Sequence, residues 1–138
     1  MPVSTAERLG LLRGAPLFQG LSDQALEPIA TASETAAFED GTVLANQGDE
    51  ADAFFVIAEG AAEMVRDGGQ VRQLGAGDYF GEIALVEGGP RTATVTAHGA
   101  VEVLVVKRQA FQRLLSEHGS LRLQLLTSAD QRHRQDHP

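Results

Sequence analysis

The sequence contains no cysteine, little positive charge and no long hydrophobic run. The lack of cysteine excludes a disulfide scaffold, a cysteine nucleophile and any zinc or iron–sulfur site held by thiolates. Only 11 Lys and Arg oppose 19 Asp and Glu, for a formal net charge of −8, which argues against direct binding to nucleic acid or to anionic lipid. No apolar run approaches the roughly 20 residues that span a bilayer, and the first residues lack the basic and apolar regions of a signal peptide. We therefore expect a cytoplasmic protein.

What is present is enough for one folded domain. The chain has 138 residues, of which 43% are hydrophobic, so we expect a single domain over residues 1–138 with one real hydrophobic core. The charge is uneven: residues 1–69 hold 3 basic and 12 acidic side chains, whereas residues 70–138 hold 8 basic and 7 acidic ones. An anionic ligand is therefore expected to bind in the second half.

Both ends of the sequence have helical patterns. Ser4 and Glu7 form a capping-box pattern, and Ser22 precedes a second apolar repeat that Pro28 is expected to limit or bend. Near the other end, helical spacing predicts one helix that ends at Gly119 and a last helix that begins at Ser120.

The middle of the chain has a β pattern. Short apolar runs alternate with glycines, and the sequence RDGGQ at residues 66–70 is typical of a hairpin turn. The predicted strands are Phe54–Ala58, Ala61–Arg66, Val71–Leu74, Thr92–Ala97 and Val101–Val106. Short strands at spacings near ten residues indicate an antiparallel roll. The fold class is therefore α+β: N-terminal helices, a jelly-roll-like β-roll over about residues 34–107, and C-terminal helices over about residues 108–135.

One segment after the middle strands has the features of a phosphate site. Gly81 precedes a piece long enough for a single helical turn, whose free backbone N–H groups attract an anion. The turn at Gly88–Pro90 then places Arg91 at the start of a strand, and its planar guanidinium suits a phosphate. Glu82 would repel phosphate but would accept a hydrogen bond from a sugar hydroxyl. The pattern predicts a compact ligand that carries both groups.

The same segment resembles the phosphate-binding cassette of cyclic nucleotide-binding domains. The matching runs are FGEIAL at residues 80–85 and PRTATV at residues 90–95. The likeness extends over about residues 17–115, and the family includes the catabolite activator protein, protein kinase A regulatory subunits and cyclic-nucleotide-gated channels. It implies a non-catalytic sensor that binds cAMP or cGMP as a ligand, with no cofactor, and that signals by rearranging its terminal helices.

The resemblance also assigns roles to individual residues. Arg91 is similar to the arginine that pairs with the cyclic phosphate, and Glu82 to the glutamate that binds the ribose 2′-hydroxyl. Backbone N–H groups that meet phosphate or sugar are implied at Gly81, Ile83 and Ala84.

Two further roles are left open by the resemblance. A hydroxyl at Thr92 suits the phosphate and also a syn guanine, so both cAMP and cGMP remain candidates. In the family the last helix closes over the base, and the candidates here are Leu123, Leu126, Thr127 and Arg132.

Other interpretations remain open. A roll that binds no nucleotide would be an interaction module, and a cupin-like enzyme would share the architecture. The four histidines do not form the clustered metal motif that a cupin needs, and the pair His133 and His137 is better explained as a solvated tail. About 23 residues follow Leu115, too few for a DNA-binding domain after a lid helix, so we expect a protein partner or an effector domain outside this chain. The initial Met1 mildly favours a complete short protein over a fragment.

Overall fold

The computed structural model describes residues 4–14, 18, 20–66, 69–81 and 90–117. Its helices are α1 (Thr5–Gly14), α2 (Asp23–Ala32) and α4 (Arg108–Glu117). Its strands are β1 (Glu34–Phe38), β2 (Val43–Ala45), β3 (Ala53–Glu59), β4 (Ala62–Arg66), β5 (Gln70–Leu74), β6 (Tyr79–Phe80), β7 (Thr94–Ala97) and β8 (Val101–Lys107). The expected short helix after Gly81 and the expected last helix lie outside the described residues.

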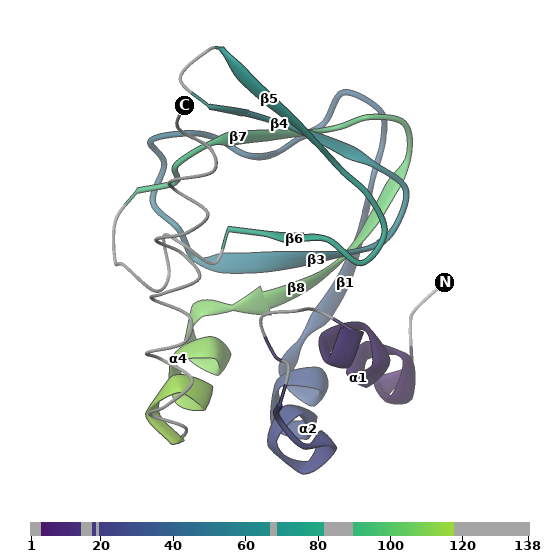
Figure 1. Ribbon diagram of the computed structural model, residues 1–138, viewed down its shortest axis with the longest axis vertical. Helices are drawn as coiled ribbons and strands as arrows, with labels where there is room; N and C mark the ends of the chain where they lie inside the picture. The colour runs from purple at the N-terminus through teal and green to yellow at the C-terminus, as the bar shows by residue number, and fades with distance from the viewer. Residues whose placement is uncertain (1–3, 15–17, 19, 67–68, 82–89, 118–138) are drawn as a thin grey trace.

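The strands form two antiparallel sheets that face each other as a roll (Figure 1). The proximal sheet, in the order β1-β8-β3-β6, lies next to the helices, and the distal sheet has the order β2-β7-β4-β5. All three described helices pack on the side of the proximal sheet that faces away from the distal sheet (Figure 1). The α+β roll with segregated helices that the sequence predicts is therefore confirmed.

Two hydrophobic clusters follow from this arrangement. The inner cluster fills the space between the sheets and includes Phe55, Ile57 and Phe80, while the outer cluster joins the helices to the proximal sheet. Strand β3 contributes to both, because successive side chains point to opposite faces of a strand. Phe54 accordingly faces the helices, where its ring lies 4.9 Å from that of Phe111 (centroid to centroid). This explains why β3 is an almost continuous apolar run.

The helix starts agree with the sequence, whereas Pro28, which was expected to limit or bend its helix, does not end it. The Glu7 N–H donates to the Ser4 hydroxyl (3.2 Å), and the Ala25 N–H donates to the Ser22 hydroxyl (3.1 Å), so both serines cap their helices. Helix α2 nevertheless continues from Asp23 past Pro28 to Ala32. It is held by its buried face, since Leu26, Ile29 and Ala30 all lie in the outer cluster.

Two details of the roll bear on the site. The β4–β5 hairpin is confirmed, with Arg66 paired to Gln70. The strand predicted to begin at Thr92 begins instead at Thr94. Before that point the backbone of Arg91 makes a different pairing: its N–H donates to Asp49 O and its carbonyl accepts from the Gly48 N–H, both at 2.8 Å. This pairing ties the residues after Pro90 to a neighbouring loop and delays the strand.

Candidate functional site

Gly81 follows the short strand β6 at one end of the roll. Its φ of +92° lies in the region that L side chains rarely adopt. A Cβ added there would collide with the Arg91 guanidinium and would lie 3.3 Å from the carbonyl oxygen of Ala53. Both the backbone conformation and the close approach of Arg91 therefore require glycine at this position.

Arg91 is one of the few buried charged residues in the structure, with 7% of its surface exposed. Its Nη2 donates to Ala53 O (2.8 Å) and its Nη1 donates to Gly81 O (3.3 Å). The guanidinium carbon lies 5.5 Å from the centroid of the Phe55 ring, which belongs to the inner cluster. These partners are neutral, so they orient the guanidinium without neutralising its charge.

A carboxylate does lie near Arg91, but in solvent. Asp52 Oδ1 is 3.7 Å from Nη2, and the Asp52 side chain is 94% exposed. Burial is the main cause that lowers the pKa of Arg91. The negative charge of Asp52 raises this pKa, the positive charge of Arg108 lowers it further, and the negative charge of Asp49 raises it. Because an arginine stays protonated in proteins, Arg91 is a buried cation that the described residues compensate only weakly. Such a site is suited to an anionic ligand.

One loop contacts both Arg91 and the first turn of helix α4. We call residues 48–53 the Gly48–Ala53 segment. On one side it meets Arg91, as described above, and a β-bridge joins Glu50 to Pro90. On the other side the Arg108 N–H donates to Asp52 O (2.8 Å), and the Arg108 guanidinium donates to Ala51 O. A movement at Arg91 can therefore reach α4 through this one segment.

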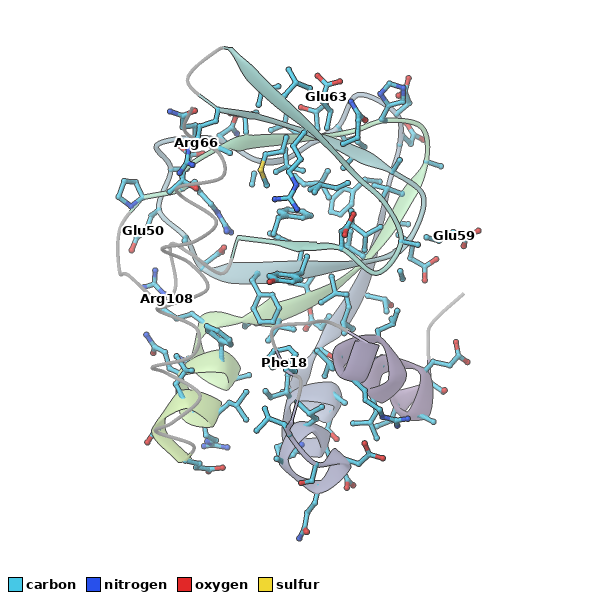
Figure 2. All side chains as sticks on the ribbon, in the orientation of Figure 1. Phe18, Glu50, Glu59, Glu63, Arg66 and Arg108 are labelled. Carbon is cyan, nitrogen blue, oxygen red and sulfur yellow. The ribbon has the colours of Figure 1, made fainter. Side chains whose placement is uncertain are left out.

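The Gly48–Ala53 segment also borders a cleft of about 640 Å³. Phe55 and Val105 provide its apolar part, and Lys107 and Arg108 add positive charge. Glu50 and Asp52 line it as well, and Figure 2 shows Glu50 and Arg108 at the same end of the roll. The cleft thus combines an apolar wall with charged groups of both signs.

The structure brings together only some of the residues that the sequence selects. Gly81 and Arg91 are in direct contact, and Thr92 follows as a half-buried residue in a bend. Glu82, Ile83 and Ala84 lie outside the described residues, as do the lid candidates Leu123, Leu126, Thr127 and Arg132.

The sequence does not indicate four groups that lie around Arg91 in addition to Gly81. These are Asp52, the carbonyl of Ala53, the ring of Phe55 and the cation Arg108. The acidic run that follows Gly48 could have indicated an exposed loop beside the site. Three carboxylates within four residues are unusual in a buried strand. The carbonyl contact has no sequence signal.

Comparison with known proteins decides the family. The profile of the family described as "Cyclic nucleotide-binding domain" matches residues 35–118, which is more than half of the chain. The chain belongs to the cyclic nucleotide-binding domain family.

Among curated proteins, this cyclic nucleotide-binding domain is similar to regulatory subunits of cAMP-dependent protein kinase. It is 41% identical to the subunit of Mucor circinelloides over 103 residues, which cover 72% of the chain and 24% of the relative. It is 40% identical to the subunit of Eremothecium gossypii over 123 residues, covering 88% of the chain and 27% of the relative. The domain thus spans about a quarter of the length of these relatives.

Among solved structures, the domain is similar to the regulatory domain of Toxoplasma gondii PKA, which was crystallised with cAMP. The TM-score is 0.82 at 32% identity, with 92% of this chain and 50% of that chain covered. The resemblance stated from the cassette motifs is therefore confirmed. Within the part of the chain that the structure describes, no helix is long and apolar enough to cross a membrane.

Proposed function

We propose that this domain is a non-catalytic sensor of a cyclic nucleotide, cAMP or cGMP, that binds at the end of the roll where Arg91 and Gly81 meet. The observation that carries the proposal is the Arg91 guanidinium, which is buried and oriented by two carbonyls; among the residues that the structure describes, the carboxylate paired with it, Asp52, lies in solvent. A cyclic phosphate supplies the negative charge that this arrangement lacks, by charge-assisted hydrogen bonds to the guanidinium.

The remaining contacts of the ligand are proposals from the cassette motif. Glu82 accepts a hydrogen bond from the ribose 2′-hydroxyl, and the N–H groups of Gly81, Ile83 and Ala84 bind phosphate or sugar. Thr92 contacts the phosphate, or a syn guanine. The sensor is a single domain over residues 1–138, with the roll at about 34–107 and the C-terminal helices at about 108–135; it needs no metal or other cofactor. The cytoplasmic location expected from the sequence stays a prediction.

The response to the ligand follows from the hydrogen bonds of Arg91. A phosphate on the guanidinium competes with Ala53 O and Asp52, so it alters the Gly48–Ala53 segment. That segment holds Arg108 at the start of α4, and the change reaches the C-terminal helices. The ligand shifts the helices only as far as it binds the two states with different affinity. The output is read by a protein partner or an effector domain, in keeping with relatives that are kinase regulatory subunits.

Calorimetric titration with cAMP and with cGMP tests the proposal. We expect saturable heat from the wild-type chain and about 100-fold weaker binding of Arg91→Ala, since a buried charge-assisted contact is lost. Arg113→Ala removes an exposed arginine from α4 and is the matched control, with unchanged affinity. Wild-type affinity in Arg91→Ala would reject the role of Arg91. No heat from the wild-type chain at millimolar ligand would favour an interaction module that binds no nucleotide.

A further inference from the structure

The aromatic ring of Phe55 lies against the charged group of Arg91. Phe55 is 9% exposed and belongs to the inner cluster, and the guanidinium carbon of Arg91 lies over its ring, 5.5 Å from the centroid. At this distance the negative face of an aromatic ring attracts a cation, and the attraction is stronger where water is excluded. A buried ring is therefore a suitable partner for a buried guanidinium.

The ring of Phe55 is held by the neighbouring strand. Phe55 of β3 is paired with Phe80 of β6, and the two rings are stacked with their centroids 4.9 Å apart. Gly81, which accepts one hydrogen bond from Arg91, follows Phe80 in the chain. Ala53, which accepts the other, lies two positions before Phe55 on the same face of β3. The pairing of β3 with β6 therefore places the ring and both acceptors around one guanidinium.

The two carbonyls by themselves do not fix the plane of the guanidinium. Nη2 donates to Ala53 O and Nη1 donates to Gly81 O, and two such bonds still allow rotation about the line through the two oxygens. A ring under the central carbon restricts this rotation. A guanidinium has more N–H donors than these two carbonyls use, and they form parallel bonds to a phosphate only when the plane has the right orientation.

We propose that Phe55 is a positioning residue for ligand binding: its ring holds the Arg91 guanidinium in the plane from which the remaining N–H groups bind a phosphate. This inference rests on the proposed function. Phe55 acts through Arg91 and through the negative charge of its ring face. The affinity for a cyclic nucleotide should therefore depend on the electron density of the ring at nearly constant shape, and replacing the ring should have no effect once the guanidinium is removed.

The first test changes the charge of the ring face and keeps its shape nearly constant. The series 4-fluoro-, 3,4,5-trifluoro- and pentafluorophenylalanine in place of Phe55 progressively weakens the negative face of the ring. We expect the affinity for the preferred nucleotide, cAMP or cGMP, to fall stepwise in calorimetric titration and to be about fivefold lower at the end of the series. The same series at Phe54, which faces the helices, is the matched control and should leave the affinity unchanged. Wild-type affinity throughout the Phe55 series, or an equal fall in both series, would overturn the proposal.

The second test is a double-mutant cycle that asks whether Phe55 acts through Arg91. Phe55→Leu alone should weaken binding about fivefold, whereas in an Arg91→Ala background, titrated at millimolar nucleotide, it should cause no further loss. A further loss of similar size in that background would overturn the proposal, because it would make the ring a direct contact of the ligand. The fluorine series decides the question even if Phe55→Leu does not fold.

The wild-type titration separates this inference from the proposed function. If the wild-type chain binds neither cAMP nor cGMP, the proposed function fails and the role of Phe55 fails with it. If the wild-type chain binds a cyclic nucleotide and the fluorine series at Phe55 has no effect, only the role of Phe55 is rejected.

Discussion

At the scale of single residues, Arg91 carries a buried charge that does not favour folding. Its guanidinium is buried beside neutral carbonyls, and burial lowers its pKa, which means that folding places the charge in a less favourable environment than water. The cost of burying this charge offsets the hydrogen bonds that the guanidinium donates to the two carbonyls. The burial of Arg91 therefore favours the proposed role in ligand binding over a role in stability.

Arg91→Met should leave the stability of the free protein nearly unchanged but abolish its stabilisation by nucleotide. Without nucleotide, the midpoint of thermal unfolding should stay within about 3 °C of the wild type, because removing the buried charge offsets the loss of its hydrogen bonds to Ala53 O and Gly81 O. With nucleotide, the increase in the midpoint seen for the wild type should be lost. Differential scanning calorimetry with and without cAMP measures both. A large loss of stability in the free variant would show that Arg91 is mainly structural.

The surroundings of Gly81 predict that an alanine at this position destabilises the fold. Gly81→Ala places a Cβ against the Arg91 guanidinium at a φ of +92°, so we expect a loss of more than about 1 kcal/mol in the free energy of unfolding. Gly10→Ala is the matched control, because Gly10 lies within α1 with open space around its Cα and should gain about 0.5–1 kcal/mol. Urea denaturation of both variants gives the comparison. Equal stability of the two variants would contradict the steric account.

At the scale of elements, helix α4 is held both by packing and by Arg108. Phe111, Leu114 and Leu115 bury one face of the helix in the outer cluster, next to Phe54 of β3. Arg108 at its first turn bonds to the backbone of residues 51 and 52. The packing supplies stability, and the polar contacts supply the connection to the site.

The packing predicts that Phe111→Ala lowers the free energy of unfolding by about 3–5 kcal/mol, since a fully buried aromatic side chain is lost. Gln112→Ala, one residue further along the same helix and exposed, should change it by less than about 0.5 kcal/mol. Chemical denaturation measures the pair. A small effect of Phe111→Ala would mean that α4 does not contribute to the folded core.

The polar contacts predict that Arg108 transmits the signal. In the wild type, cyclic nucleotide should change the hydrogen-exchange rates of residues 108–117. In Arg108→Met the guanidinium no longer reaches Ala51 O or Glu50, so this change should shrink while exchange near Gly81 still responds. Mass spectrometry of peptides from both regions separates the two effects. An undiminished response of α4 in the variant would assign the coupling to another route.

At the scale of the whole molecule, we propose that the roll and its helices unfold and respond to ligand as one unit. A ligand that binds only the folded state stabilises it according to mass action, by about 2.7 kcal/mol at 100 times its dissociation constant. For a domain of this length, that corresponds to roughly 10 °C in the unfolding midpoint. We therefore expect one cooperative transition that shifts upward by about this amount with the preferred nucleotide. Two unfolding transitions, of which only one shifts with nucleotide, would contradict the proposal that the chain unfolds as a single unit.

Much of this molecule was predictable because it depends on local patterns. Ser4 and Ser22 cap helices wherever the chain places them, the glycine turn after Arg66 closes a hairpin, and the apolar run of β3 is typical of a strand buried on both faces. The cassette motif assigned Gly81 and Arg91 to one ligand site, and in the structure the two residues are in contact.

The sequence by itself determined the class of fold, the family and the pair Gly81–Arg91, because turns, caps, periodicity and a long motif are properties of adjacent residues. Only the tertiary structure decided what surrounds that pair. Three features depend on which strands and loops become neighbours. They are the contact of Arg91 with the Ala53 carbonyl, the position of Asp52 in solvent, and the link from Arg108 to residues 51 and 52. Strand register sets those neighbours, and it is fixed by pairing between segments far apart in the chain.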